Sequence, residues 1–109
     1  MPASYDLSGS TALVTGAAGD IGRAVAVRLA TSGAAVALTD LERAADGLER
    51  TRAECAAAGD ESRVLVAPAD VTDPASVAGV FDVTAERLDT PDLVFNNAGV
   101  QGELLPLQD

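Results

Sequence analysis

The sequence contains no histidine and no lysine, and it has one cysteine, Cys55, and one tyrosine, Tyr5. Without histidine or lysine, the chain offers no His-activated nucleophile, no Schiff-base amine, no HExxH zinc site and no Walker A lysine. A single cysteine forms neither an internal disulfide nor a multi-cysteine metal site, so we expect Cys55 to be a small packing residue. We therefore predict no metal site, and we assign no catalytic residue.

Positive charge is also scarce, because the net charge is −10 and all seven basic residues are arginines. Nucleic acids and anionic membranes bind clustered cations, so we expect neither as a partner. The sequence has no apolar run long enough to span a membrane and no basic, apolar leader. These two features predict a cytoplasmic protein.

Four short apolar runs alternate with three helical patterns along the 109 residues. Continuous apolar runs rich in β-branched residues are typical of strands that are buried on both faces of a parallel sheet. We expect an α/β fold with the order βαβαβαβ, which gives a Rossmann-type parallel sheet with helices on both faces. We expect one domain over residues 1–109, incomplete at its C-terminus. The predicted strands are residues 11–15, 35–39, 64–67 and 93–96, and the predicted helices are residues 21–31, 42–58 and 74–88.

Local signals place the ends and faces of these helices. Thr39 and Glu42 have the spacing of a capping box before the second helix. Asp73 is a suitable cap for the third helix, with Pro74 at its first position. Helical spacing predicts one apolar face on the first helix (Ile21, Val25, Leu29) and one on the third (Val77, Val80, Phe81, Thr84).

The stretch TGAAGDIG, residues 15–22, follows the first predicted strand. Its glycines permit a tight turn, and they let backbone N–H groups approach a pyrophosphate at a helix N-terminus. Asp40 follows Gly22 by eighteen residues, which is close to the place of the carboxylate that binds a ribose 2′-hydroxyl in dinucleotide-binding folds. The same carboxylate repels a 2′-phosphate, which favours NAD over NADP. The alternatives are a glycine-rich turn without a ligand, and an Asp40 that only flanks the next helix.

Two further loops follow the third and fourth predicted strands, and they contain DVTD (70–73) and NNAG (96–99). Together with TGAAGDIG and Asp40, these motifs resemble the short-chain dehydrogenase/reductase family, and NNAG is the most specific of them. The resemblance covers the whole chain. It implies that the glycine loop holds the pyrophosphate, Asp40 with Leu41 the adenosine ribose, the Asp-Val pair the adenine, and the NNAG loop both riboses. The implied cofactor-binding residues are Gly16, Ala17, Ala18, Gly19, Asp20, Ile21, Asp40, Leu41, Asp70, Val71, Asn97, Ala98 and Gly99.

The glycine spacing departs from the compact branch of that family. TG-x-x-G-x-x-G resembles the extended branch of epimerases and dehydratases, whereas NNAG resembles the compact branch, and we give NNAG the greater weight. Asp20 adds a negative charge to the loop. It opposes a pyrophosphate unless its side chain points to solvent.

The family's catalytic serine, Tyr-x-x-x-Lys pair and assisting asparagine lie beyond the NNAG loop, and this sequence stops ten residues after Gly99. We expect the chain to be the N-terminal, dinucleotide-binding portion of an NAD-dependent oxidoreductase. Such an enzyme transfers a hydride between nicotinamide and a small alcohol or carbonyl substrate, and we expect a homo-oligomer. The alternatives are an extended-branch NAD-dependent epimerase or dehydratase, and a non-catalytic nucleotide-binding module.

Overall fold

The computed structural model describes residues 6–97, so the predicted contacts at Ala98 and Gly99 lie outside the described residues. Strands and helices alternate in the predicted order. They are β1 (Thr11–Thr15), α1 (Asp20–Thr31), β2 (Ala35–Thr39), α2 (Ala45–Ala58), β3 (Val64–Val66), α3 (Pro74–Arg87) and β4 (Leu93–Asn96). Two short 3₁₀ helices, η1 (Glu42–Ala44) and η2 (Glu61–Arg63), flank α2.

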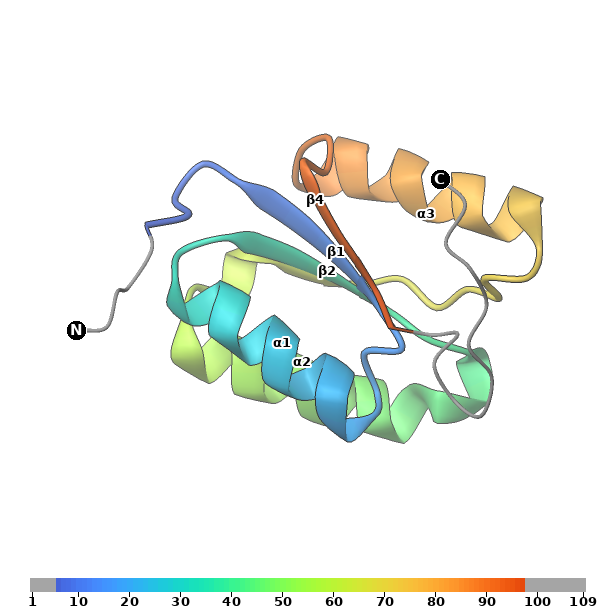
Figure 1. Ribbon diagram of the computed structural model, residues 1–109, viewed down its shortest axis with the longest axis horizontal. Helices are drawn as coiled ribbons and strands as arrows, with labels where there is room; N and C mark the ends of the chain where they lie inside the picture. Colours follow the sequence, from blue (N-terminus) through green and yellow to red (C-terminus); the bar gives the residue numbers. More distant parts are fainter. Residues whose placement is uncertain (1–5, 98–109) are drawn as a thin grey trace.

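The four strands form one parallel sheet in the order β3-β2-β1-β4. Helices α1 and α2 cover one face of this sheet, and α3 covers the other (Figure 1). This is the predicted Rossmann-type arrangement. Because all strands run the same way, the loops after β1, β2, β3 and β4 meet at one edge of the sheet, where ligands of such folds bind.

The strands supply an apolar layer to each face of the sheet. Val14 and Leu38 belong to the layer beneath α1 and α2, whereas Leu13 belongs to the layer beneath α3. Successive residues of a strand point to opposite faces, so a run that is apolar throughout serves both layers. Cys55 is fully buried in the α1–α2 layer, which confirms its predicted packing role.

The predicted apolar face of α1 is wrong for Ile21 but right for Val25 and Leu29, which pack against the core. Gly22, Ala26 and Ala30 are the buried residues of α1, while Ile21 is 59% exposed. A helix that approaches a sheet closely leaves room for a hydrogen atom or a methyl group at the contact. Val25 and Leu29 pack beside this contact, and Ile21 lies outside it.

The predicted capping box before α2 is also wrong. Thr39 is the last residue of β2, paired with Thr15, and its side chain is buried. Its hydroxyl has no hydrogen-bond partner within residues 6–97. The register with β1 keeps Thr39 extended, so the chain passes through η1 before α2 begins at Ala45.

The other predicted helix signals agree better with the structure. The Asp73 carboxylate accepts a hydrogen bond of 3.1 Å from the Ala75 N–H and caps α3 as expected. Val80 and Thr84 form the buried face of α3, whereas Phe81 is 38% exposed. The third strand and the third helix each end one residue before the predicted limit.

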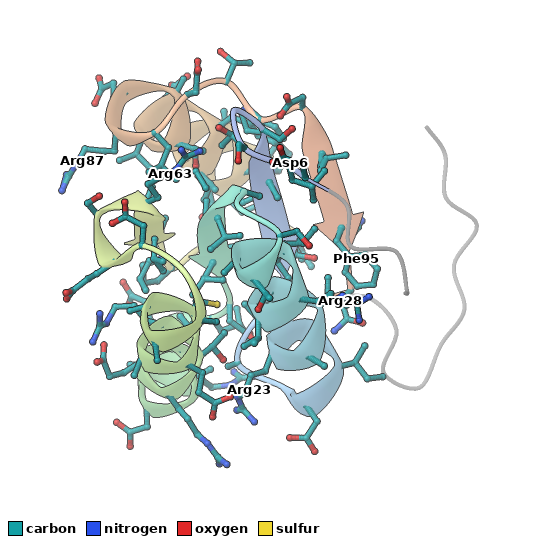
Figure 2. The ribbon with its side chains drawn as sticks, turned by 90° about the vertical axis from the view of Figure 1, so that its left-hand side faces the viewer. Asp6, Arg23, Arg28, Arg63, Arg87 and Phe95 are labelled. Carbon is teal, nitrogen blue, oxygen red and sulfur yellow. The ribbon has the colours of Figure 1, made fainter. Side chains whose placement is uncertain are left out.

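The β4 strand lies at the outer edge of the described sheet, and its apolar side chains are uncovered. Leu93 is 40% exposed, Val94 is 53% exposed and Phe95 is 40% exposed. Phe95 projects from this strand in Figure 2. Within the described part of the chain, this edge of the sheet is therefore open and apolar. No helix in residues 6–97 is long and apolar enough to cross a membrane.

Candidate functional site

The glycine loop joins β1 to α1, and two of its glycines are required by the protein itself. Gly16 has a φ of +64°, in the left-handed region that glycine occupies most easily. A Cβ atom on Gly22 would collide with the carbonyl oxygen of Gly16. This contact lets α1 start directly against the loop.

Gly19 differs from these two glycines, because the described protein does not require glycine at this position. Its φ is −86°, and the nearest atom to a Cβ built there is the Gly16 carbonyl oxygen at 3.8 Å. The space in front of Gly19 is therefore open, and it suits a group that approaches the backbone from outside. Gly19 is also the N-cap of α1, and no side chain caps it within the described residues. The first N–H groups of α1 consequently favour an anion at this place.

Asp20 forms a local ion pair at the start of α1. Its side chain is fully exposed, and its Oδ1 atom forms an ion pair of 3.2 Å with Nη1 of Arg23. The Arg23 guanidinium thus offsets the carboxylate that we considered an obstacle to pyrophosphate binding. Ile21 lies next to it and is largely exposed.

Asp40 lies against the glycine loop, although 22 residues separate it from Ala18. Its Oδ2 atom accepts a hydrogen bond of 3.0 Å from the Ala18 N–H, and its Oδ1 atom accepts one of 2.8 Å from the Leu41 N–H. An ionised carboxylate has about four acceptor positions, so these two bonds leave capacity for a ligand hydroxyl. Asp40 and Leu41 are both half-buried.

Ala17 is completely buried. Its N–H donates to the Thr39 carbonyl at 3.1 Å, and its own carbonyl accepts a hydrogen bond of 2.7 Å from the Thr51 hydroxyl. The backbone polar groups of Ala17 are therefore used inside the protein. This residue supports the loop from within.

The first asparagine of the NNAG loop is tied to the end of β1. The Thr15 hydroxyl donates to Oδ1 of Asn96 at 2.9 Å, and the Asn97 N–H donates to the same Thr15 oxygen at 2.8 Å. These bonds place Asn97 beside the glycine loop. Thr15 thus links the end of β1 to the NNAG loop. Its position directly before the glycine loop is a sequence signal for this role, but we did not include Thr15 among the predicted site residues.

Asp70 and Val71 lie on the α3 side of the same sheet edge, and both are exposed. The hydroxyl and the N–H of Thr72 donate to Oδ1 of Asp70 at 2.6 and 2.9 Å. These hydrogen bonds lower the pKa of Asp70 below its ordinary value of 3.8. Val71 also lines a cavity of about 210 Å³ between the sheet and α3, together with Thr39 and Asn96.

The structure also places two residues at the loop that sequence reasoning missed. Arg23 is half-buried, and its guanidinium contacts Ala18 and Thr51. The sequence gives no signal for Thr51, because it lies inside an ordinary helix 34 residues from its partner Ala17. Within the described residues, no group of three or more His, Cys, Asp or Glu side chains is arranged to hold a metal ion.

Comparison with known proteins agrees with this geometry. The family model described as short chain dehydrogenase matches residues 10–108. The chain is 48% identical over 102 residues to 1-deoxy-11-beta-hydroxypentalenate dehydrogenase from Streptomyces avermitilis, a match that covers 93% of this chain and 36% of that protein. It is 40% identical over 96 residues to levodione reductase from Leifsonia aquatica, covering 88% of this chain and 35% of that protein.

Solved structures show the same similarity in three dimensions. A dehydrogenase/reductase from Sinorhizobium meliloti 1021 superposes with a TM-score of 0.81 at 39% identity, covering 89% of this chain and 37% of that one. The chain thus spans about a third of the length of these relatives. It belongs to the short-chain dehydrogenase family, whose members are oxidoreductases that bind nicotinamide dinucleotides.

Proposed function

We propose that this chain binds NAD at the carboxyl edge of its sheet and is the dinucleotide-binding part of an NAD-dependent oxidoreductase. The observation that carries this proposal is the hydrogen bond between the Asp40 carboxylate and the Ala18 N–H. This bond holds a ribose-binding carboxylate directly beside the open N-terminus of α1. A dinucleotide needs these two groups next to each other, because its pyrophosphate and its adenosine ribose are adjacent.

In this proposal, different residues bind different parts of the cofactor. The loop residues Gly16, Gly19, Asp20 and Ile21 surround the pyrophosphate at the N-terminus of α1, while Ala17 supports them from inside and the Ala18 N–H holds Asp40. Asp40 and Leu41 hold the adenosine ribose, and Asp70 and Val71 contact the adenine. Asn97, with Ala98 and Gly99 after it, flanks the riboses.

The bound nicotinamide supplies the hydride chemistry, and the protein binds and orients it. The substrate in this proposal is a small alcohol or carbonyl compound. The dehydrogenase and reductase names of the relatives support this reading over an extended-branch epimerase or a non-catalytic module. The open space at Gly19 supports the fit of a phosphate pressed against the backbone.

The preference for NAD follows from charge. A 2′-phosphate on the adenosine ribose would lie a few ångströms from the Asp40 carboxylate, whose two hydrogen bonds come from uncharged backbone N–H groups. At about 5 Å and an effective dielectric of roughly 40, the repulsion of each phosphate charge weakens binding by about tenfold or more. We therefore expect NADH to bind at least about tenfold more tightly than NADPH.

Titration of the purified chain with NADH and with NADPH, followed by nicotinamide fluorescence, tests both parts of the proposal. In Asp40→Asn, which keeps an oxygen for the Ala18 N–H and loses the charge, the preference for NADH is expected to fall to within a few fold. Asp82→Asn removes an exposed carboxylate on α3 and is the matched control, with the preference unchanged. Equal affinities of the wild-type chain for the two cofactors would contradict the NAD assignment. Binding of neither would contradict the dinucleotide site itself.

A further inference from the structure

Two carbonyl oxygens of the glycine loop are held from inside the protein by side chains of α1 and α2. The Thr51 hydroxyl, from α2, lies 2.7 Å from the carbonyl oxygen of Ala17. Nη2 of Arg23, from α1, donates to the carbonyl oxygen of Ala18, also at 2.7 Å. Thr51 is fully buried and the Arg23 side chain is 13% exposed, so these bonds are largely shielded from water. Arg23 lies between the two helices (Figure 2).

The peptide unit that joins Ala17 to Ala18 is held at both of its ends. Its carbonyl oxygen accepts from Thr51, and its N–H donates to the Asp40 carboxylate. A peptide unit is planar, with its C=O and N–H pointing in opposite directions, so fixing one end orients the other. The Thr51 hydroxyl therefore orients the N–H group that holds Asp40, without touching Asp40.

Arg23 strengthens this arrangement. Its Nε–H donates to the Thr51 oxygen at 3.2 Å. A hydroxyl has one proton, and the Ala17 carbonyl at 2.7 Å is a closer acceptor for it than the Gly47 carbonyl at 3.1 Å. The result is a chain of hydrogen bonds that starts at a charged donor and ends at the loop, and such chains are polarised along their length. One guanidinium thus binds two consecutive loop peptides, one directly and one through Thr51.

Gly47, one turn before Thr51, allows α2 to lie close enough to the loop for these contacts. A Cβ atom on Gly47 would come within 2.8 Å of the Ala18 Cβ and 3.0 Å of the Ala18 carbonyl oxygen. Only a residue without a side chain permits this approach. The close packing of α2 against the loop therefore places the Thr51 hydroxyl within hydrogen-bond distance of the Ala17 carbonyl.

We propose that Arg23 and Thr51 are positioning residues for the dinucleotide site, an inference that rests on the proposed function. They orient the peptides of residues 17–19 and, through the Ala18 N–H, the Asp40 carboxylate that receives the ribose. Neither residue contacts the cofactor in this scheme. Loss of the Thr51 hydroxyl leaves the buried Ala17 carbonyl without its donor and frees the peptide to rotate, so the bond from Ala18 to the Asp40 carboxylate weakens and only the bond from the Leu41 N–H still orients it.

Three variants test this inference in the full chain. Thr51→Val removes the hydroxyl at nearly constant shape, and Thr51→Ser restores it. Thr84→Val is the matched control, because Thr84 is also fully buried and its hydroxyl also donates at 2.7 Å to a backbone carbonyl, that of Val80 in α3. Fluorescence titration with NADH is expected to show affinity about tenfold weaker for Thr51→Val and within about twofold of wild type for Thr51→Ser and Thr84→Val.

Amide hydrogen exchange of the ligand-free chain gives a readout that does not depend on the cofactor. Protection of the Ala18 amide is expected to fall about tenfold in Thr51→Val relative to Thr84→Val. A wild-type chain that fails to bind NADH contradicts the proposed function, while the exchange data still report on positioning. If Thr51→Val matches Thr84→Val in both affinity and Ala18 protection, the inference is overturned.

A fourth variant covers the case in which Thr51→Val does not fold. Arg23→Lys keeps the positive charge, but an ammonium group cannot reproduce the fork that reaches Ala18 and Thr51 together. We expect NADH affinity about fivefold weaker in this variant, with the far-ultraviolet circular dichroism unchanged. If Arg23→Lys binds NADH with wild-type affinity, the proposed positioning role of the Arg23 guanidinium is wrong.

Discussion

Replacing Gly19 by alanine should separate ligand binding from folding. The added methyl group meets no protein atom closer than the Gly16 carbonyl oxygen at 3.8 Å, and alanine adopts a φ of −86° without strain. Loss of freedom in the unfolded chain stabilises the variant by about 0.4–1 kcal/mol. Alanine is a poorer N-cap than glycine by a similar amount, about 0.5–1 kcal/mol. These effects offset each other, so the melting temperature is expected to stay within about 4 °C of wild type.

The effect on the cofactor is expected to be much larger. The methyl group occupies the open space in front of the loop, so a pyrophosphate is pushed back from the N–H groups of α1. Loss of one hydrogen bond to a charged group costs about 1.5–3 kcal/mol, which corresponds to roughly 10- to 150-fold in affinity. NADH titration followed by fluorescence, together with thermal unfolding of the ligand-free variant by circular dichroism, measures both quantities.

Two other glycines give the controls. Gly22→Ala introduces the collision with the Gly16 carbonyl and is expected to destabilise the chain by about 1–3 kcal/mol. Gly79→Ala lies on α3 with no atom within 4 Å of its Cβ, so it should stabilise the chain by about 0.5–1 kcal/mol and leave affinity unchanged. If Gly19→Ala binds NADH as tightly as wild type, no phosphate lies against Gly19 and the proposed position of the cofactor is wrong.

Two further predictions concern ionisable side chains. Burial, with a smaller contribution from Glu54, raises the pKa of the Cys55 thiol to about 11, so at pH 8 an aromatic disulfide reagent should label it only at the rate of unfolding; rapid labelling of the folded chain would contradict this. Two hydrogen bonds from Thr72, chiefly the one from its hydroxyl and secondly the one from its N–H, lower the pKa of Asp70. The stability that they provide is complete above about pH 3.8, and it is lost as the pH falls through the lower pKa that Asp70 has in the folded chain. Carboxyl titration by NMR should show the pKa of Asp70 rising toward 3.8 in Thr72→Val, and an unchanged pKa would exclude the hydroxyl as its main cause.

The strands were predictable because each one is an apolar run that ends at a polar or turn residue. Residues 11–15, 35–39 and 93–96 coincide with β1, β2 and β4. The start of α2 was not predictable in this way, because sheet pairing keeps Thr39 extended against its local capping signal. A single-residue propensity does not outweigh a ladder of backbone hydrogen bonds in the centre of a sheet.

The candidate site was predictable only as far as it consists of motifs. The structure brings the glycine loop and Asp40 together, as the spacing suggested. The cofactor-binding roles of these residues, like those of Asp70, Val71 and Asn97, remain predictions. Thr51 could not be found, because its importance depends on how closely α2 approaches the loop. That distance is set by tertiary packing at Gly47, and no local pattern records it.

The pairing of β4 with β1 has a consequence for the order in which this chain folds. The hydrogen bond from Thr15 to Asn96 joins positions 81 residues apart, whereas Thr11 pairs with Ala35 after only 24. Closing these loops in an unfolded chain differs by roughly 1 kcal/mol in entropy, in favour of the shorter one. We therefore expect β1, α1 and β2 to assemble first, with the glycine loop and Asp40 already joined, and β4 to add last. On the ribosome, the half of the site proposed to bind phosphate and ribose would form before the asparagines of the fourth strand are synthesised.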